Sequence, residues 1–100
     1  MVAARKKIDD EHISVGYDRP VDVLYIVRGG PVASEGEGLP YGIELDFATR
    51  TGEPCGVTVL GYRRNGWSGR LTELAKIASR HLKVDPAELA KLIRTKAGVD

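Results

Sequence analysis

The chain has almost none of the residues that build disulfide or thiolate metal frameworks, since Cys55 is the one cysteine among 100 residues. One cysteine cannot form an internal disulfide or a site made of several thiolates. This excludes the disulfide-stapled class of small secreted domain and predicts a reducing, cytoplasmic location. The sequence also lacks any run approaching the ~18 consecutive apolar residues of a membrane span, so we expect no membrane association.

We expect no secretory leader either. Residues 1–11 carry three basic and three acidic side chains and no apolar stretch, which is untypical of a signal peptide. We predict a flexible arm over residues 1–11 and a single domain over residues 12–100. A hydrophobic content of 42% with 29% charged residues excludes a disordered chain, and the length supports one modest core.

The chain has no large excess of charge, because 15 basic residues nearly balance 14 acidic ones. The balance hides an uneven distribution. Residues 12–62 hold three basic and seven acidic side chains, whereas residues 63–100 hold nine basic and four acidic ones. An acidic middle is therefore followed by a basic C-terminal third.

The acidic middle has the two-residue period of half-buried strands. Apolar residues alternate over residues 13–17 and again over 41–47, where Glu44 and Asp46 face the other way. The run 23–27 is apolar on both faces, which predicts an inner strand, and residues 57–60 supply a fourth segment. We predict a four-stranded antiparallel meander within residues 12–62, with residues 29–42 as a long, irregular, mobile loop.

The basic third has a helical period instead. Leu71, Leu74, Ala78 and Leu82 recur at helical spacing, and Asp85-Pro86-Ala87-Glu88 has the form of a capped helix start. We predict a helical pair over residues 68–97 that covers one face of the sheet, giving an α+β fold. The opposite face then needs a partner, and we predict a homodimer because isologous pairing is the commonest solution.

A short pattern at the first predicted turn resembles a known family. Tyr17-Asp18 is followed by Asp22-Val23-Leu24-Tyr25-Ile26, and later by Gly42-Ile43-Glu44-Leu45-Asp46. This is similar to the bacterial and archaeal family called domain of unknown function 2283, over about residues 12–60, with the helical pair as an extension. The resemblance implies a small bacterial protein and a fold, but no activity. It singles out Tyr17, Asp18, Asp22, Leu24 and Tyr25 as motif residues with a structural role.

Catalytic groups are sparse. Asp18 and Asp22 flank one turn, where they would either share a proton or a metal ion or, as we prefer, bond to backbone N–H groups of the turn and the next strand. Cys55 fits a small apolar filler better than a nucleophile, and neither His12 nor His81 belongs to a ligand-spaced pair. We predict no catalytic, cofactor or metal residues, and no enzyme activity.

The basic third leaves two interpretations open. Residues 77–89 resemble a helix-turn-helix, although Lys83 occupies the place where that pattern usually has glycine, and an ordinary helical hairpin with a solvated basic side is the competing interpretation. Trp67 either stacks on a base or a partner protein or closes a corner of the core.

Two functions follow. The first is a non-enzymatic protein-interaction or regulatory module with an unknown protein partner; the alternative is a nucleic-acid-binding regulator that uses the basic helices. The candidate contact residues for either partner are Arg63, Arg64, Trp67, Arg70, Lys76, Arg80, Lys83, Lys91 and Arg94.

Overall fold

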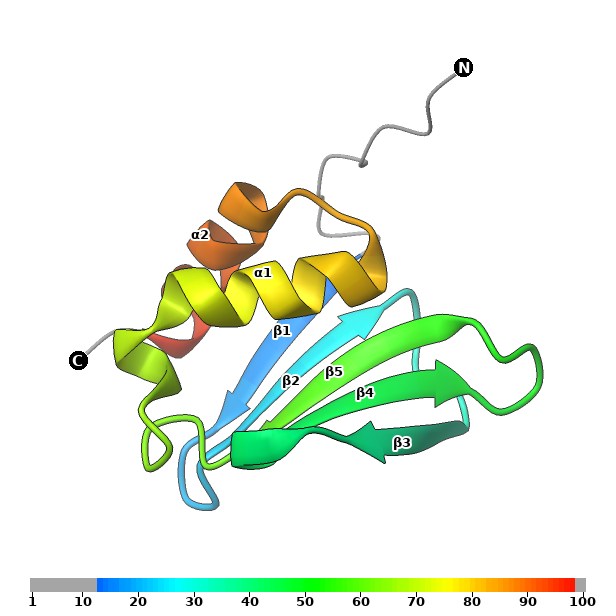
Figure 1. The fold of residues 1–100 in the computed structure, drawn as a ribbon, viewed down its shortest axis with the longest axis horizontal. Helices are drawn as coiled ribbons and strands as arrows, with labels where there is room; N and C mark the ends of the chain where they lie inside the picture. Colours follow the sequence, from blue (N-terminus) through cyan, green and yellow to red (C-terminus); the bar gives the residue numbers. More distant parts are fainter. Residues whose placement is uncertain (1–12, 99–100) are drawn as a thin grey trace.

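A computed structural model describes residues 13–98, and the structural statements below concern these residues. The fold is α+β, with an antiparallel sheet and two C-terminal helices packed on one of its faces (Figure 1). The arm predicted over residues 1–11, and His12 with it, lie outside the described residues.

The sheet is built from β1 (Ile13–Asp18), β2 (Val23–Arg28), β3 (Ser34–Gly38), β4 (Ile43–Ala48) and β5 (Pro54–Leu60). Two short 3-10 turns, η1 (Pro40–Gly42) and η2 (Trp67–Gly69), precede β4 and the helices α1 (Leu71–Leu82) and α2 (Pro86–Ala97). The strand order is β1-β2-β5-β4-β3, with every neighbouring pair antiparallel.

The prediction of four strands was wrong, because the loop expected over residues 29–42 contains β3 and η1. The β3 sequence Ser-Glu-Gly-Glu-Gly has no apolar alternation, and all five of its residues are exposed at the edge of the sheet. It is a strand because it pairs with β4, and no pattern within its own sequence predicts that pairing. Tyr41, expected inside a strand, lies instead in η1 with φ 63°.

The meander was also wrong, since β5 pairs with β2 and lies between β2 and β4. The central position buries Val57 and Val59 completely, next to Leu24 and Ile26 of β2. Two apolar strands side by side under the helices bury more surface than a sequential order would. The prediction of β2 as an inner strand is confirmed.

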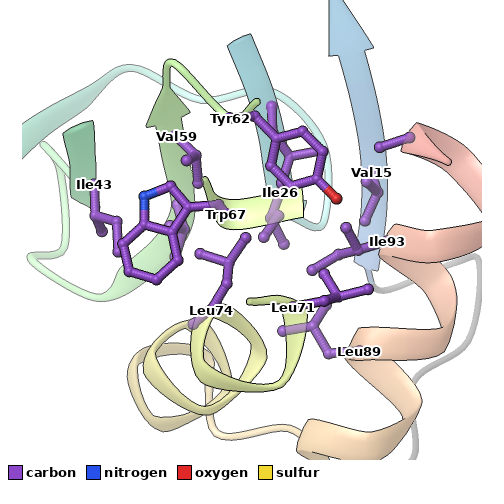
Figure 2. Packing of buried hydrophobic residues seen from close by; sticks show 14 of the residues in the cluster. Val15, Ile26, Ile43, Val59, Tyr62, Trp67, Leu71, Leu74, Leu89 and Ile93 are labelled. Atoms are coloured by element: carbon purple, nitrogen blue, oxygen red, sulfur yellow. The ribbon is translucent and has the colours of Figure 1, made fainter. Parts of the chain in front are cut away.

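The core lies between the sheet and the helices (Figure 2). Leu71, Leu74 and Leu82 of α1, and Leu89 and Ile93 of α2, are buried. α1 packs against β5 and α2 packs against β1. Those of α1 are the positions that the helical spacing predicts, so the inner face of α1 is confirmed.

The turn between the helices follows the expected capping chemistry. Asp85 caps α2, its Oδ2 accepting a hydrogen bond from Glu88 N at 2.8 Å, and Pro86 occupies the first turn. Lys83 ends α1 in the left-handed region with φ 58° and ψ 49°, and Val84 is buried beneath the turn. α2 then packs against α1 and crosses behind it at a steep angle (Figure 1).

Lys83→Gly should stabilise the fold. A left-handed backbone costs a residue with a Cβ about 1 kcal/mol, and glycine at the helix C-terminus removes that cost. We expect the free energy of unfolding to rise by roughly 0.5–1 kcal/mol and Tm by several degrees in thermal denaturation. Arg80→Gly, placed inside α1, should lower stability instead. A fall in Tm for Lys83→Gly would contradict the left-handed turn.

Candidate interaction surfaces

The Asp22 carboxylate is the hub of one end of the sheet. Its Oδ1 accepts hydrogen bonds from the Tyr17 hydroxyl at 2.7 Å and from Arg63 N at 2.9 Å, and its Oδ2 accepts one from Arg64 N at 3.0 Å. The Asp22 carbonyl oxygen accepts two further bonds, from Gly61 N and Tyr62 N. One residue with φ 57° therefore fastens the β1–β2 turn to the segment that follows β5.

Asp22 is held in its charged form. Burial alone would raise its pKa, but the hydrogen bonds from Arg63 N and Arg64 N and from Tyr17 outweigh burial and hold the pKa below the ordinary 3.8. The carboxylate accepts three hydrogen bonds, and all three stabilise the fold. Its two backbone N–H partners lie 41 and 42 residues away in the chain, rather than at the start of the next strand as the sequence suggests.

The other motif residues separate into two groups. Leu24 is fully buried, and the Tyr17 ring packs edge-on against Tyr62 with centroids 5.4 Å apart. Asp18 is exposed, and its carboxylate accepts no hydrogen bond from any residue that the structure describes, so the expected turn bond is not made there. Tyr25 points away from the helices and is 42% exposed.

The face of the sheet opposite the helices, here called the open face, carries no described element (Figure 1). Strand registers assign to it one residue in two from each strand. These positions are Ser14, Gly16 and Asp18 on β1; Val23, Tyr25 and Val27 on β2; Gly56, Thr58 and Leu60 on β5; Glu44 and Asp46 on β4; and Gly36 and Gly38 on β3. An apolar column on β2 thus runs beside Gly56, Thr58 and the terminal Leu60 of β5, and an acidic column on β4 lies beyond β5.

The acidic column, Glu44 and Asp46, is half-buried, and its two carboxylates lie close to each other. Thr58 Oγ1 donates to Asp46 Oδ2 at 2.8 Å, and the neighbouring Asp46 carboxylate, with burial, raises the pKa of Glu44. The Glu44 side chain folds across Gly36, where any Cβ would overlap it. Glycines on both sides of the column therefore leave the open face shallow, with Tyr25 and Leu60 as its projecting side chains.

Cys55 and His81 do not form a nucleophile and base. Burial and the nearby Asp46 raise the pKa of the Cys55 thiol, which keeps it protonated at neutral pH. His81 instead packs edge-on against Phe47, with centroids 4.9 Å apart, and its Nε2 donates to the Asp46 carbonyl oxygen at 3.0 Å. The His81 side chain therefore links α1 to β4.

Three of the candidate contact residues have structural partners. Trp67 is 2% exposed and its Nε1 donates to the Tyr41 carbonyl oxygen at 2.8 Å, so it closes the core corner (Figure 2). Arg70 lies over the Trp67 ring and bonds Glu73, while Arg63 lies over the Tyr17 ring and donates to the Ala97 carbonyl oxygen. The remaining candidates are exposed: Arg64, Lys76, Arg80, Lys83, Lys91 and Arg94.

A second surface feature lies between the helices. A groove of about 400 Å³ lies between α1 and α2, and its uncharged lining residues are Thr72, Ala75, Pro86, Ala87 and Ala90. Lys76 of α1 and Arg94 of α2 line it as well. Both cations were among the contact residues expected from the sequence, but the groove alanines were not. Ala75 and Ala90 directly follow the buried Leu74 and Leu89, and this neighbouring position is the signal that could have identified them.

Comparison with protein-family models, with curated proteins and with solved structures finds no match to this chain. The resemblance to domain of unknown function 2283 therefore stays a prediction. No helix in residues 13–98 is long and apolar enough to cross a membrane. The same residues include no cluster of three or more histidine, cysteine or acidic side chains arranged to hold a metal ion.

Proposed function

We propose that the chain is a non-enzymatic protein-interaction module that pairs with a second copy through its open face. The observation that carries this is the exposure of Tyr25 (42%) and Leu60 (50%) on two inner strands of a face that no described element covers. Apolar side chains gathered on one face mark an association surface. The cytoplasm is part of the proposal, since the free thiol of Cys55 suits a reducing compartment.

The registers on the open face make it self-complementary. A two-fold axis parallel to the strands, between β2 and β5, lays β2 of one copy over β5 of the other. Val27 then meets Gly56, Tyr25 meets Thr58 and Val23 meets Leu60. Two of these pairs set a larger side chain against a smaller one, and the third sets two apolar side chains together. All three lie near the axis, where two face-to-face sheets that cross at about 30° stay closest.

The same axis keeps like charges apart. It lays β4 of one copy over β1 of the other, so that Glu44 faces Gly16 and Asp46 faces Ser14. An axis across the strands would set the acidic columns against each other, at a cost in repulsion. Charge and side-chain volume therefore favour the same dimer.

Tyr25→Glu should break this dimer. Because Tyr25 lies at the centre of the pairing, a carboxylate there would be buried without a partner, and we expect the dissociation constant to rise at least about a hundredfold, or roughly 3 kcal/mol. Light scattering after gel filtration, over a range of concentrations, measures the change.

Tyr41→Glu is the matched control, because Tyr41 is exposed near Arg70 on the helix side of the sheet. We expect the dimer of this variant to have the same dissociation constant as the dimer of the unaltered chain. A monomeric unaltered chain at every concentration, or an undisturbed Tyr25→Glu dimer, overturns the proposal.

Nucleic-acid binding is the second candidate, because eight exposed basic side chains lie on the helix layer and its neighbourhood in the described part of the chain. Duplex affinity that falls steeply with salt supports it, and no retention at ~50 mM salt rejects it. The helix geometry gives it less support, since α2 packs against both α1 and β1 rather than projecting from the domain.

A further inference from the structure

The groove between α1 and α2 exists because both helices turn their large side chains toward the sheet. Leu74 and Leu89 are buried in the core, and three of the residues that line the space between the helices are alanines. Ala75 is itself nearly inaccessible, so it forms the bottom of the groove, while Ala87 and Ala90 form its α2 side. The result is a mostly apolar groove at the crossing of the two helices.

Positive charge lines this apolar floor. Lys76 and Arg94 reach the groove from different helices, and both are exposed. Within the part of the chain that the structure describes, neither forms a salt bridge. A mostly apolar groove bordered by two available cations is complementary to a ligand with an apolar stripe flanked by carboxylates.

The surrounding charge adds to this preference. From residue 70 to residue 97 the chain carries seven basic and three acidic side chains. Two of the three acids are engaged, Glu73 with Arg70 and Asp85 in the cap of α2. The helix layer therefore attracts acidic partners before contact and steers their approach.

We propose that this groove binds an acidic amphipathic helix of a partner protein. Leucine or isoleucine side chains of that helix would contact Ala75 and Ala90, and its Asp or Glu residues would pair with Lys76 and Arg94. Docking of an amphipathic helix into an apolar groove is a recurrent mode of recognition. A nucleic acid would use the cations alone, because its phosphates gain nothing from an alanine floor. The proposal rests on the proposed interaction function and names the partner of a surface distinct from the open face.

The test uses a fluorescent helical peptide about five turns long, with leucines at every third or fourth position and glutamates beside them. Fluorescence anisotropy measures its affinity for the full chain. The double variant Lys76→Glu/Arg94→Glu should weaken binding at least about tenfold, because two attractive pairs become repulsive. Ala90→Leu, which fills the floor without changing charge, should also weaken it.

Arg80→Glu/Lys91→Glu is the matched control, since it reverses two exposed charges of the same helices outside the groove. We expect it to change affinity less than about threefold. An equal loss in both double variants overturns the groove in favour of diffuse electrostatic attraction, and a duplex that competes equally with every variant points to nucleic acid. Absence of peptide binding at about 1 mM also overturns it. Light scattering of the same samples reports the dimer separately, so failure of one proposal is distinguishable from failure of the other.

Discussion

Asp22→Ala should unfold a large share of the molecules at moderate temperature. The substitution removes the acceptor for the Tyr17 hydroxyl and for two backbone N–H groups, and it leaves alanine at φ 57°. Unpaired donors cost about 1–3 kcal/mol each where water is excluded, and the left-handed backbone costs about 1 kcal/mol more. Because the site is half-buried, we expect a total near 3 kcal/mol, seen as a Tm lower by at least about 12 °C.

The control is Asp18→Ala, which removes the other motif carboxylate. Asp18 is exposed and makes no hydrogen bond with the described residues, so its loss should change stability by less than about 0.5 kcal/mol. Similar losses for the two variants would contradict the role of Asp22 as a hub.

Acid should act on the same site. The folded pKa of Asp22 lies below 3.8, so its contribution to stability is complete above that value and is lost as the pH falls through the folded pKa. Thermal melts in acid should therefore show a steeper loss of Tm for the unaltered chain than for Asp22→Ala.

Gly42→Ala should be comparably destructive, for a different reason. Gly42 has φ 85°, and a Cβ at this position would overlap the carbonyl oxygen of Leu60. Relief requires the start of β4 to move away from the end of β5, which disturbs the corner where Trp67 bonds to Tyr41. We expect a loss of roughly 3 kcal/mol or more in chemical denaturation.

Gly52→Ala separates the two causes, because Gly52 has φ 76° but open space where a Cβ would be. Its cost should be limited to about 1 kcal/mol of backbone strain. Equal costs at the two positions would show that the close approach to Leu60 contributes nothing.

The helical pair was the most predictable part of the fold. Caps and spacing are local signals, and both the Asp85 cap and the buried face of α1 follow from them. The turn at Lys83 is also a local matter, although the sequence alone suggests that glycine would suit it better. Two helices on one face of a sheet follow from amphipathicity alone.

The sheet was less predictable because its order depends on distant partners. β3 has no apolar residue, so its sequence shows no alternation of apolar and polar side chains. β5 lies in the centre of the sheet because it pairs with β2 and shares the core with it. The hub at Asp22 likewise joins segments more than forty residues apart. Of the two surfaces, the acidic column was visible in the alternation around Glu44, whereas the groove depends on how two helices meet.

The place of β5 between β2 and β4 also sets how the chain can fold. β1 with β2, and β3 with β4 and β5, are hairpin units that close over short connections. Their junction pairs Val23 with Leu60, so a long segment must lose its freedom before the first contact between the units forms. Topologies rich in such distant pairings fold more slowly than local ones of equal stability. The meeting of these two units is therefore the entropic bottleneck of the fold, and the Asp22 hub fastens that junction at its end.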